Sequence, residues 1–456
     1  MASTYLSKTF SSTPTGTKKC TISMWIKRSK IGAEHCLISW TNGSGGRDAM
    51  RFDGTGDQLR CFINGASSAD IQTNRKFRDV SAWYHIVLAI DTTQGTSSNR
   101  MKLYINGVQE TSFTGGLTYP SQDHVLFFGS ANACNVGRDA SDTTGVYDGS
   151  MSHVHFVDGS ALAPTVFGET DSTTGEWKII TTPSYTVGTN GFFILKDGNS
   201  VTDSSTNSNN FTVGAGTLTK TEDCPSNIFA TWNVLNSNPG STINFTNGNT
   251  HVSPASDSSY IYAGSTLAMP KKTGSKFYAE FLNYGVQGGL IGIGTMDTLD
   301  NAMRQNVDIS NNSTYTDFGR AVYRESGNGQ IYYVTGETNT NVTMSNNDIQ
   351  QIAIDLENGK FYVGKNGTWT LSGDPANNTG GLDISSASWY TNNDLFCFVA
   401  GSYTGVGSGN YRANFGNGYF GTTAVSSAGT NASNIGIFEY DVPTGFTALS
   451  TKGLNL

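Results

Sequence analysis

Short apolar and aromatic runs, separated by turn-forming residues, recur through the first third of the chain. Residues 21–27 (TISMWIK) and 102–105 (KLYI) are rich in β-branched and aromatic side chains, which favour strands. Asn106-Gly107 follows the second run and predicts a tight hairpin, because both residues tolerate a positive φ angle. Residues 151–157 (MSHVHFV) alternate apolar and polar side chains, as a half-buried strand does. Strands at this spacing predict a β-sandwich.

A second series of strand signals occupies the later part of the chain. Residues 276–281 (KFYAEF) alternate, and residues 289–294 (GLIGIG) are typical of a buried strand. Residues 350–363 read as a strand, an Asn358-Gly359 turn and a returning strand. Asn366-Gly367 supplies a further turn of the same kind. We expect a second sandwich built from these hairpins, with a positive φ at both Asn-Gly pairs.

The pattern divides the chain into four stretches. Strand signals fill residues 1–165 and 255–425, whereas residues 166–254 mix short apolar runs with Asn, Ser and Thr. We predict an all-β fold of two β-sandwich (jelly-roll-type) modules. A β-rich connector or small β subdomain joins them, and a tail, residues 426–456, packs on the second module.

Composition agrees with a folded, loop-rich β protein. Gly contributes 54 residues, charged residues are only 14%, and aromatics are 11%, whereas disordered chains are poor in aromatics. The formal net charge of −8 argues against a nucleic-acid partner, which requires a basic stripe. No apolar leader or run of about 18 apolar residues occurs, so we expect neither a signal peptide nor membrane insertion. Six cysteines without a CxxC pair predict buried free thiols.

The first region resembles the laminin-G and pentraxin-like jelly rolls of the concanavalin type. Trp25 lies on an early strand, Trp83-Tyr84-His85 leads the strand that ends at Asp91, and Gly149 opens a late strand. Tyr104-Ile105-Asn106-Gly107 makes the hairpin between them. The resemblance implies that Trp25 and Trp83 are core aromatics.

The stretch after this region resembles a connector found in many structural proteins of tailed bacteriophages. The matching segments are FGETD at 167–171, TGEWK at 174–178, GFF at 191–193, DSS at 203–205, NNFT at 209–212 and DCPSN at 223–227. The end of the chain, FEYDVPTGFTAL at 438–449, resembles the ending of the same proteins. Cys224 departs from the usual small or polar residue, and Asp441-Val442 stands where prolines are usual.

The third region resembles the SPRY domain, another bent β-sandwich. Five motifs occur in order: Gly274 to Glu280, Gly292 to Gly294, Asp355 to Tyr362, Lys365 to Trp369, and Asn414 to Gly416. A Gly-Asp pair of the family pattern is replaced by Asn347-Asp348. The resemblance implies a binding module whose partner is chosen by variable loops.

The sequence contains few groups that could carry chemistry. Concanavalin-type glucanases need carboxylates alternating on one strand, about 5–5.5 Å apart for retention. Glu169, Asp171 and Glu176 come nearest, but the last spacing is wrong and the segment belongs to the connector pattern. We predict no catalytic residues, and we expect that the chain is not an enzyme.

Two further groups resemble metal sites. His153 and His155 are two apart and would share one face of a strand, although a buried pair is the simpler interpretation. Asp53-Gly54-Thr55-Gly56-Asp57 offers oxygens that calcium accepts, although it also reads as an ordinary hairpin loop. We therefore predict no metal, no cofactor and no cofactor-binding residues.

The resemblance to tailed-phage proteins implies a phage virion structural and binding protein: a tail fibre, a tail appendage or a head decoration. The expected partners are other virion proteins and a host-surface carbohydrate, with no nucleic acid, and the chain is expected to be oligomeric or multi-copy in the particle. The expected location is the virion, after synthesis in the host cytoplasm. The alternative is a polysaccharide depolymerase on the concanavalin-like fold. Binding is expected at loops, with the Asn-rich segment 298–317 as the best candidate.

Overall fold

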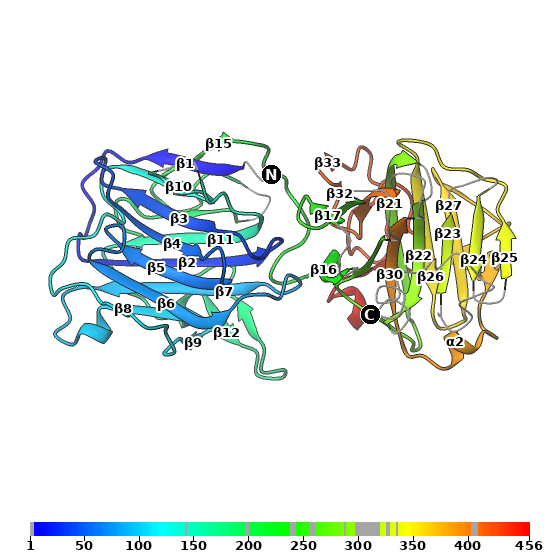
Figure 1. Ribbon diagram of the computed structural model, residues 1–456, viewed down its shortest axis with the longest axis horizontal. Coiled ribbons are helices and arrows are strands. Elements are labelled where there is room, and N and C mark those ends of the chain that lie inside the picture. Colours follow the sequence, from blue (N-terminus) through cyan, green and yellow to red (C-terminus); the bar gives the residue numbers. More distant parts are fainter. Residues whose placement is uncertain are drawn as a thin grey trace. The chain divides into compact units, whose positions relative to one another are not determined.

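The computed structural model describes residues 4–141, 144–196, 200–237, 243–254, 261–286, 289–296, 320–324, 329–333, 336–402 and 409–456. Within these ranges the structure is almost entirely strand and turn. The helical elements are α2 (Ser388–Thr391) and four short 3-10 turns, which confirms the predicted all-β class. The chain forms two compact units, Met1–Lys220 and Thr221–Leu456. Figure 1 shows their strands.

The first unit is a sandwich of two large sheets. The seven-stranded sheet has the order β15 (Thr212–Ala215), β1 (Tyr5–Thr9), β10 (Ala133–Val136), β3 (His35–Thr41), β4 (Arg47–Phe52), β5 (Gln58–Ile63), β6 (Ala69–Lys76). The six-stranded sheet has the order β14 (Phe192–Ile194), β11 (Gly149–Asp158), β2 (Lys19–Arg28), β7 (Tyr84–Asp91), β8 (Met101–Ile105), β9 (Val108–Gln109). A separate hairpin consists of β12 (Gly168–Thr170) and β13 (Trp177–Ile179).

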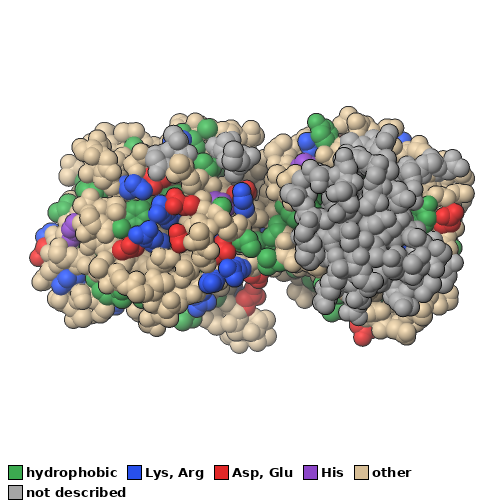
Figure 2. Space-filling model, in the orientation of Figure 1, with side chains coloured by type: hydrophobic (Ala, Val, Ile, Leu, Met, Phe, Trp, Pro, Cys, Tyr) green, Lys and Arg blue, Asp and Glu red, His purple; other side chains and the backbone are tan. Residues whose placement is uncertain are grey.

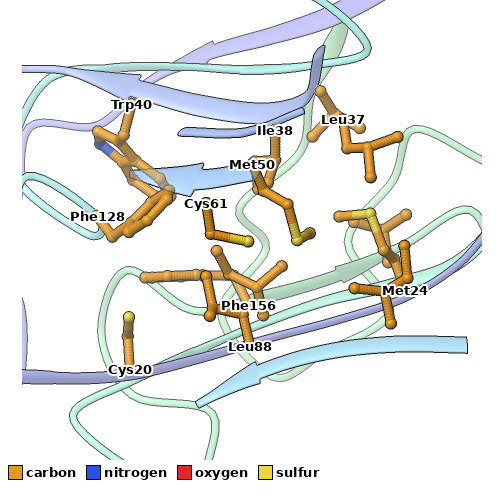
Figure 3. Packing of buried hydrophobic residues seen from close by; sticks show 14 of the residues in the cluster. Cys20, Met24, Leu37, Ile38, Trp40, Met50, Cys61, Leu88, Phe128 and Phe156 are labelled. Carbon is orange, nitrogen blue, oxygen red and sulfur yellow. The ribbon is translucent and has the colours of Figure 1, made fainter. Parts of the chain in front are cut away.

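The hydrophobic core of the first unit lies between these sheets, as Figure 3 shows. Trp40 and Met50 from one sheet pack toward Met24, Leu88 and Phe156 from the other, and all five are fully buried. Each such side chain contributes roughly 1.5–3 kcal/mol by leaving water. All six cysteines are free thiols, and five of them are buried, as expected from their spacing.

The connector motifs attach two edge strands to this sandwich. β14 pairs with β11, and β15 pairs with β1. The Asp203 carboxylate accepts the backbone N–H groups of Phe193 at 2.8 Å and Asn209 at 2.8 Å. The Asn190 amide donates to the backbone oxygen of Gly129 at 2.7 Å. These polar side chains form hydrogen bonds with backbone groups of the surrounding segments, so their role is structural.

The second unit also contains two large sheets. One has the order β16 (Trp232–Ser237), β19 (Ile261–Ser265), β30 (Leu395–Ser402), β22 (Gly289–Thr295), β23 (Arg320–Arg324), β24 (Gln330–Tyr333), β25 (Gly336–Asn339), with β20 (Met269–Pro270) beside β30. The other has the order β17 (Ile243–Thr246), β18 (His251–Pro254), β31 (Gly409–Asn414), β21 (Lys276–Val286), β26 (Ile349–Asp355), β27 (Lys360–Lys365), β28 (Thr368–Trp369), with β29 (Leu382–Asp383) beside β27 and β34 (Thr447–Ala448) beside β21. β32 (Tyr419–Phe420) and β33 (Thr423–Ala424) form a small hairpin.

The two predicted hairpin turns of the second unit are confirmed. Asn366 and Gly367 both have positive φ angles, +47° and +85°, as a two-residue turn of this kind requires. At the other turn only Gly359 is positive, at +66°. There the Asp355 carboxylate accepts the backbone N–H groups of Glu357 and Asn358. The loop is longer than two residues, and of the Asn-Gly pair only the glycine has a positive φ angle.

The end of the chain packs on the outer side of the nine-stranded sheet. Phe438, Val442 and Phe446 form an apolar cluster with Tyr278 and Phe229. Tyr278 faces this cluster because its neighbour in β21, Phe277, faces the core between the sheets. The tail therefore covers one outer sheet face.

Candidate functional site

The carboxylates considered for glycoside cleavage lie on an exposed hairpin. Glu169 is on β12 and Glu176 precedes β13, and both are exposed. Lys178 forms ion pairs of 3.3 Å with both Glu169 and Asp171. The backbone N–H groups of Thr174 and its neighbour hold the pKa of Asp171 at about 2. Asp171 is therefore held ionised beside a lysine and is not poised as a general acid.

A serine and a histidine do meet in the first unit, on the outer side of the six-stranded sheet. His85 Nε2 lies 2.9 Å from Ser23 Oγ. On the other side of the ring, Trp177 Nε1 donates to His85 Nδ1 at 2.9 Å. The His85 ring also stacks on Trp25 with 4.8 Å between ring centroids. Trp25 is thus buried, as its resemblance implied, but on the outer side of its strand.

The protonation of His85 excludes nucleophilic catalysis by this pair. An indole N–H can only donate, so Nδ1 accepts and the ring proton sits on Nε2. Nε2 then donates to Ser23 Oγ and cannot take the proton of the hydroxyl, as a catalytic base must. Burial also lowers the pKa of His85 to about 3. The imidazole is neutral, and its hydrogen bonds connect Trp177 of the β12–β13 hairpin to Ser23 of the sheet.

The two histidines of β11 are also committed to packing. A β-bulge interrupts the register between Ser152 and His155, and His153 has a φ of +49°. His155 Nδ1 lies 2.6 Å from the Tyr185 hydroxyl, and its ring stacks on Phe193 at 3.9 Å. Burial lowers the pKa of His155 well below its ordinary value. In the part of the chain that the structure describes, no group of three metal-ligating side chains comes together.

The loop considered for calcium holds its main carboxylate in other bonds. Asp57 Oδ1 is 3.1 Å from the Arg28 guanidinium and accepts the N–H of Gly32 at 2.7 Å. Asp57 Oδ2 is 3.1 Å from Arg78 Nε. Two guanidinium groups repel a cation, so this carboxylate is a structural anchor. Asp53 contacts the Gln72 amide at 3.3 Å.

One arrangement that the sequence did not indicate lies on the outer face of the seven-stranded sheet. The guanidinium carbons of Arg47, Arg51 and Arg60 lie 5.5, 5.2 and 5.6 Å from the centre of the Phe62 ring. Strand alternation directs these side chains away from the core, since Met50 on β4 faces it. We call these three arginines, with Phe62 and their three carboxylate partners, the arginine face. Figure 2 shows basic and acidic side chains intermixed over this part of the first unit.

Each arginine of this face has its own carboxylate partner. Arg60 binds Asp70 through two parallel contacts, Nε to Oδ1 at 2.8 Å and Nη2 to Oδ2 at 2.6 Å. Arg51 contacts Glu34 at 2.9 Å.

The third pair is Arg47 Nε with Asp139 Oδ2, at 2.6 Å. The arginine side chains are 23%, 14% and 26% exposed for Arg47, Arg51 and Arg60, whereas Phe62 is 2% exposed. The face therefore has no net charge, is held in place, and still reaches solvent.

A buried carboxylate in the second unit holds the tail. Glu280 is fully buried and accepts the backbone N–H groups of Glu439 and Tyr440, both at 2.8 Å. The Tyr278 hydroxyl donates to it at 2.8 Å, and Asn414 Nδ2 lies 3.5 Å away. Burial raises its pKa to about 7. Tyr278, Glu280 and Asn414 belong to the motifs that resemble the SPRY pattern, and here they act together on the tail.

Segment 298–317, the predicted binding loop, lies outside the described residues. None of the helices in the described part of the chain has the length and apolar character needed to cross a membrane.

Comparison with known proteins supports the first resemblance. Residues 3–167 match the family model described as the Concanavalin A-like lectin/glucanases superfamily, so this part of the chain is a concanavalin-like domain. No curated protein matches the chain.

Among solved structures, the SPRY domain of human HERC1 is 14% identical, with a TM-score of 0.28 over 40% of this chain and 96% of that chain. The SAP-like pentraxin of Limulus polyphemus is 17% identical, with a TM-score of 0.27 over 35% and 71%. Domains LG4-5 of the mouse laminin alpha1 chain are 7% identical, with a TM-score of 0.27 over 90% and 85%. At these values the three likenesses carry no conclusion about this chain.

Proposed function

We propose that this chain is a structural and binding protein of a tailed-bacteriophage particle, in a tail fibre, a tail appendage or a head decoration. Its modules contribute to virion assembly and attach to a carbohydrate on the host surface. The concanavalin-like match over residues 3–167 supports a binding module in the first unit. The connector and tail motifs support the phage origin, because their resemblance to phage structural proteins spans the stretches between and after the modules.

The observation that carries the binding function is a contrast within the first unit. Its candidate catalytic groups have other roles: His85 holds its ring proton toward Ser23, and Lys178 forms ion pairs with both Glu169 and Asp171. The arginine face, in contrast, keeps polar groups ordered and partly open to solvent. These groups are positioned and reach solvent, and they support binding without bond cleavage.

The proposed partners follow from charge and architecture. A net charge of −8 opposes nucleic-acid binding. Other virion proteins and host-surface glycans are the partners that we propose. We also propose that the second unit is a SPRY-like binding module, because its five motifs resemble that family in order. The particle would contain the chain in several copies.

Two measurements test this proposal. In a density map of the purified particle, the two sandwiches should fit at defined, repeated positions on the tail or the head. Purified protein should deplete from solution on contact with host cells and slow adsorption of the particle. A particle without the chain, together with no binding to host cells, would show that the proposal is wrong.

A further inference from the structure

The outer face of the seven-stranded sheet differs from the opposite side of the same unit. On the six-stranded sheet, Val87 and Val157 face outward and are covered by Phe167, with Leu162 and Tyr185 packed around them. The connector thus occupies that side. The arginine face shows no such apolar cover among the described residues, and its side chains are 14–26% exposed at the three arginines.

We infer that the arginine face is a binding site for neutral, hydroxyl-rich glycans. This inference rests on the proposed function and assigns its ligand class and its place. The sequence argument placed binding at loops because the sheet faces must pack. That requirement applies to the inner faces of the sheets, which form the core. An outer face does not have to pack against the other sheet.

Charge balance argues for a neutral ligand. Three guanidinium groups and three carboxylates lie in pairs of 2.6, 2.9 and 2.6 Å. A phosphate, sulfate or uronate would meet an arginine whose charge is already balanced, and it would lie beside a carboxylate that repels it. A hydroxyl group both donates and accepts, so it suits alternating donors and acceptors.

The number of hydrogen-bonding groups also suits a sugar. Each guanidinium has five N–H donors in a fixed fork, and Arg60 uses two of them on Asp70. The donors that remain are coplanar, which matches neighbouring hydroxyls on a pyranose ring. Carboxylate oxygens of Asp70 and Glu34, 25% and 33% exposed, supply acceptors.

The arginine side chains are already ordered, which lowers the entropic cost of binding a ligand at this face. Long side chains lose rotamer freedom when they bind a ligand. The arginines are already held between a carboxylate and the Phe62 ring, by ion pairing and cation–π contact. Phe62 itself is 2% exposed, so it supports the arginines and does not stack on the sugar.

The alternative is that the three ion pairs only shield Phe62 from water. Arg→Lys substitutions separate these two roles, because lysine keeps the charge and the aliphatic stem but loses the planar fork. Lysine would still shield Phe62 from water, whereas the hydrogen bonds of a planar guanidinium to sugar hydroxyls would be lost. Arg75, on the same unit, pairs with Glu110 at 2.8 Å and is 50% exposed. Arg75→Lys is therefore the matched control.

The experiment uses the full chain and measures affinity by calorimetry and by electrophoresis in polysaccharide gels. The neutral probes are mannan, galactan and dextran, and the acidic probe is alginate. We expect wild type to bind at least one neutral probe and to bind alginate no better. Arg60→Lys and Arg51→Lys should each weaken that binding at least about tenfold with an unchanged melting temperature, and Arg75→Lys should leave it unchanged.

Three outcomes would overturn the inference: wild-type affinity in Arg60→Lys and Arg51→Lys, preference for alginate, or no binding to any neutral probe. Depletion by host cells, measured in parallel, separates this failure from failure of the proposed function. If the protein still adsorbs to cells, the binding function stands and the site lies elsewhere. If adsorption is also absent, host attachment fails as well, and only the position of the chain in the particle can still support the proposed function.

Discussion

Glu280 makes the stability of the second unit depend on pH. Its carboxylate is fully buried under the tail and faces the Tyr278 hydroxyl and the backbone of Glu439 and Tyr440. Because burial raises its pKa from 4.5 to about 7, the folded state holds a proton that the unfolded state releases at a lower pH. Glu280→Gln keeps the shape of the side chain and removes the titration.

The sign and size of the pH dependence follow from the difference in bound protons between the folded and unfolded states. Between pH 4.5 and pH 7 the folded unit binds more protons than the unfolded chain, so its free energy of unfolding falls as pH rises. The contribution is fully present below pH 4.5 and is lost as pH rises through about 7. At about 1.4 kcal/mol for each tenfold change in proton affinity, the total is about 3 kcal/mol, most of which is lost between pH 5 and pH 8.

The measurement is urea denaturation of wild type and Glu280→Gln at pH 5, 6, 7 and 8. The difference between the two proteins removes the contribution of other titrating groups, such as Asp48 in the first unit, whose pKa burial raises to about 6. We expect wild type to lose stability relative to the variant by about 2–3 kcal/mol across this range. A difference that stays constant with pH, or one that changes in the opposite direction, would refute the reasoning.

Three further changes test other parts of the structure. Gly359→Val should lower the free energy of unfolding by about 1 kcal/mol or more, because φ is +66° and a new Cβ would lie 2.6 Å from the Cα of Ser385; an unchanged melting temperature would contradict this. Trp177→Phe should cost about 1–2 kcal/mol in urea denaturation by leaving His85 Nδ1 without its donor, and equal stability would mean that the bond contributes nothing. Wild type and Glu169→Gln should release equally little reducing sugar from host capsule or lipopolysaccharide, and cleavage abolished by the substitution would show an enzyme.

The all-β fold and its hairpins were predictable because their signals are local. Asn366-Gly367 marks a two-residue turn by residue type alone, and alternation in residues 276–281 marks a half-buried strand. The single positive φ at Gly359 was not predictable, since it depends on how Asp355 caps the loop. Sequence spacing also could not show the bulge in β11 that displaces His153.

The arginine face could not be predicted, because its members come from separate strands and loops. Arg47 and Arg51 on β4 meet Arg60 on β5 only through the pairing of these strands. Two arginines four residues apart, and therefore on one face of a strand, are the local signal in residues 47–52 (RDAMRF). Their carboxylate partners, such as Asp139, are distant in sequence and have no pattern in common.

The same contrast explains why the motifs indicate the fold but not the proposed ligand site. Asp203 accepts three backbone N–H groups, and Glu280 accepts two from the tail. A substitution at either leaves buried donors without partners at about 1–3 kcal/mol each, so any chain with this fold is constrained to retain them. Arg51 and Arg60 instead form ion pairs that are partly open to solvent, and pairs near the surface contribute about 1 kcal/mol or less. The motifs therefore describe residues that hold the fold together, whereas the proposed ligand site becomes visible only in the arrangement of its residues in space.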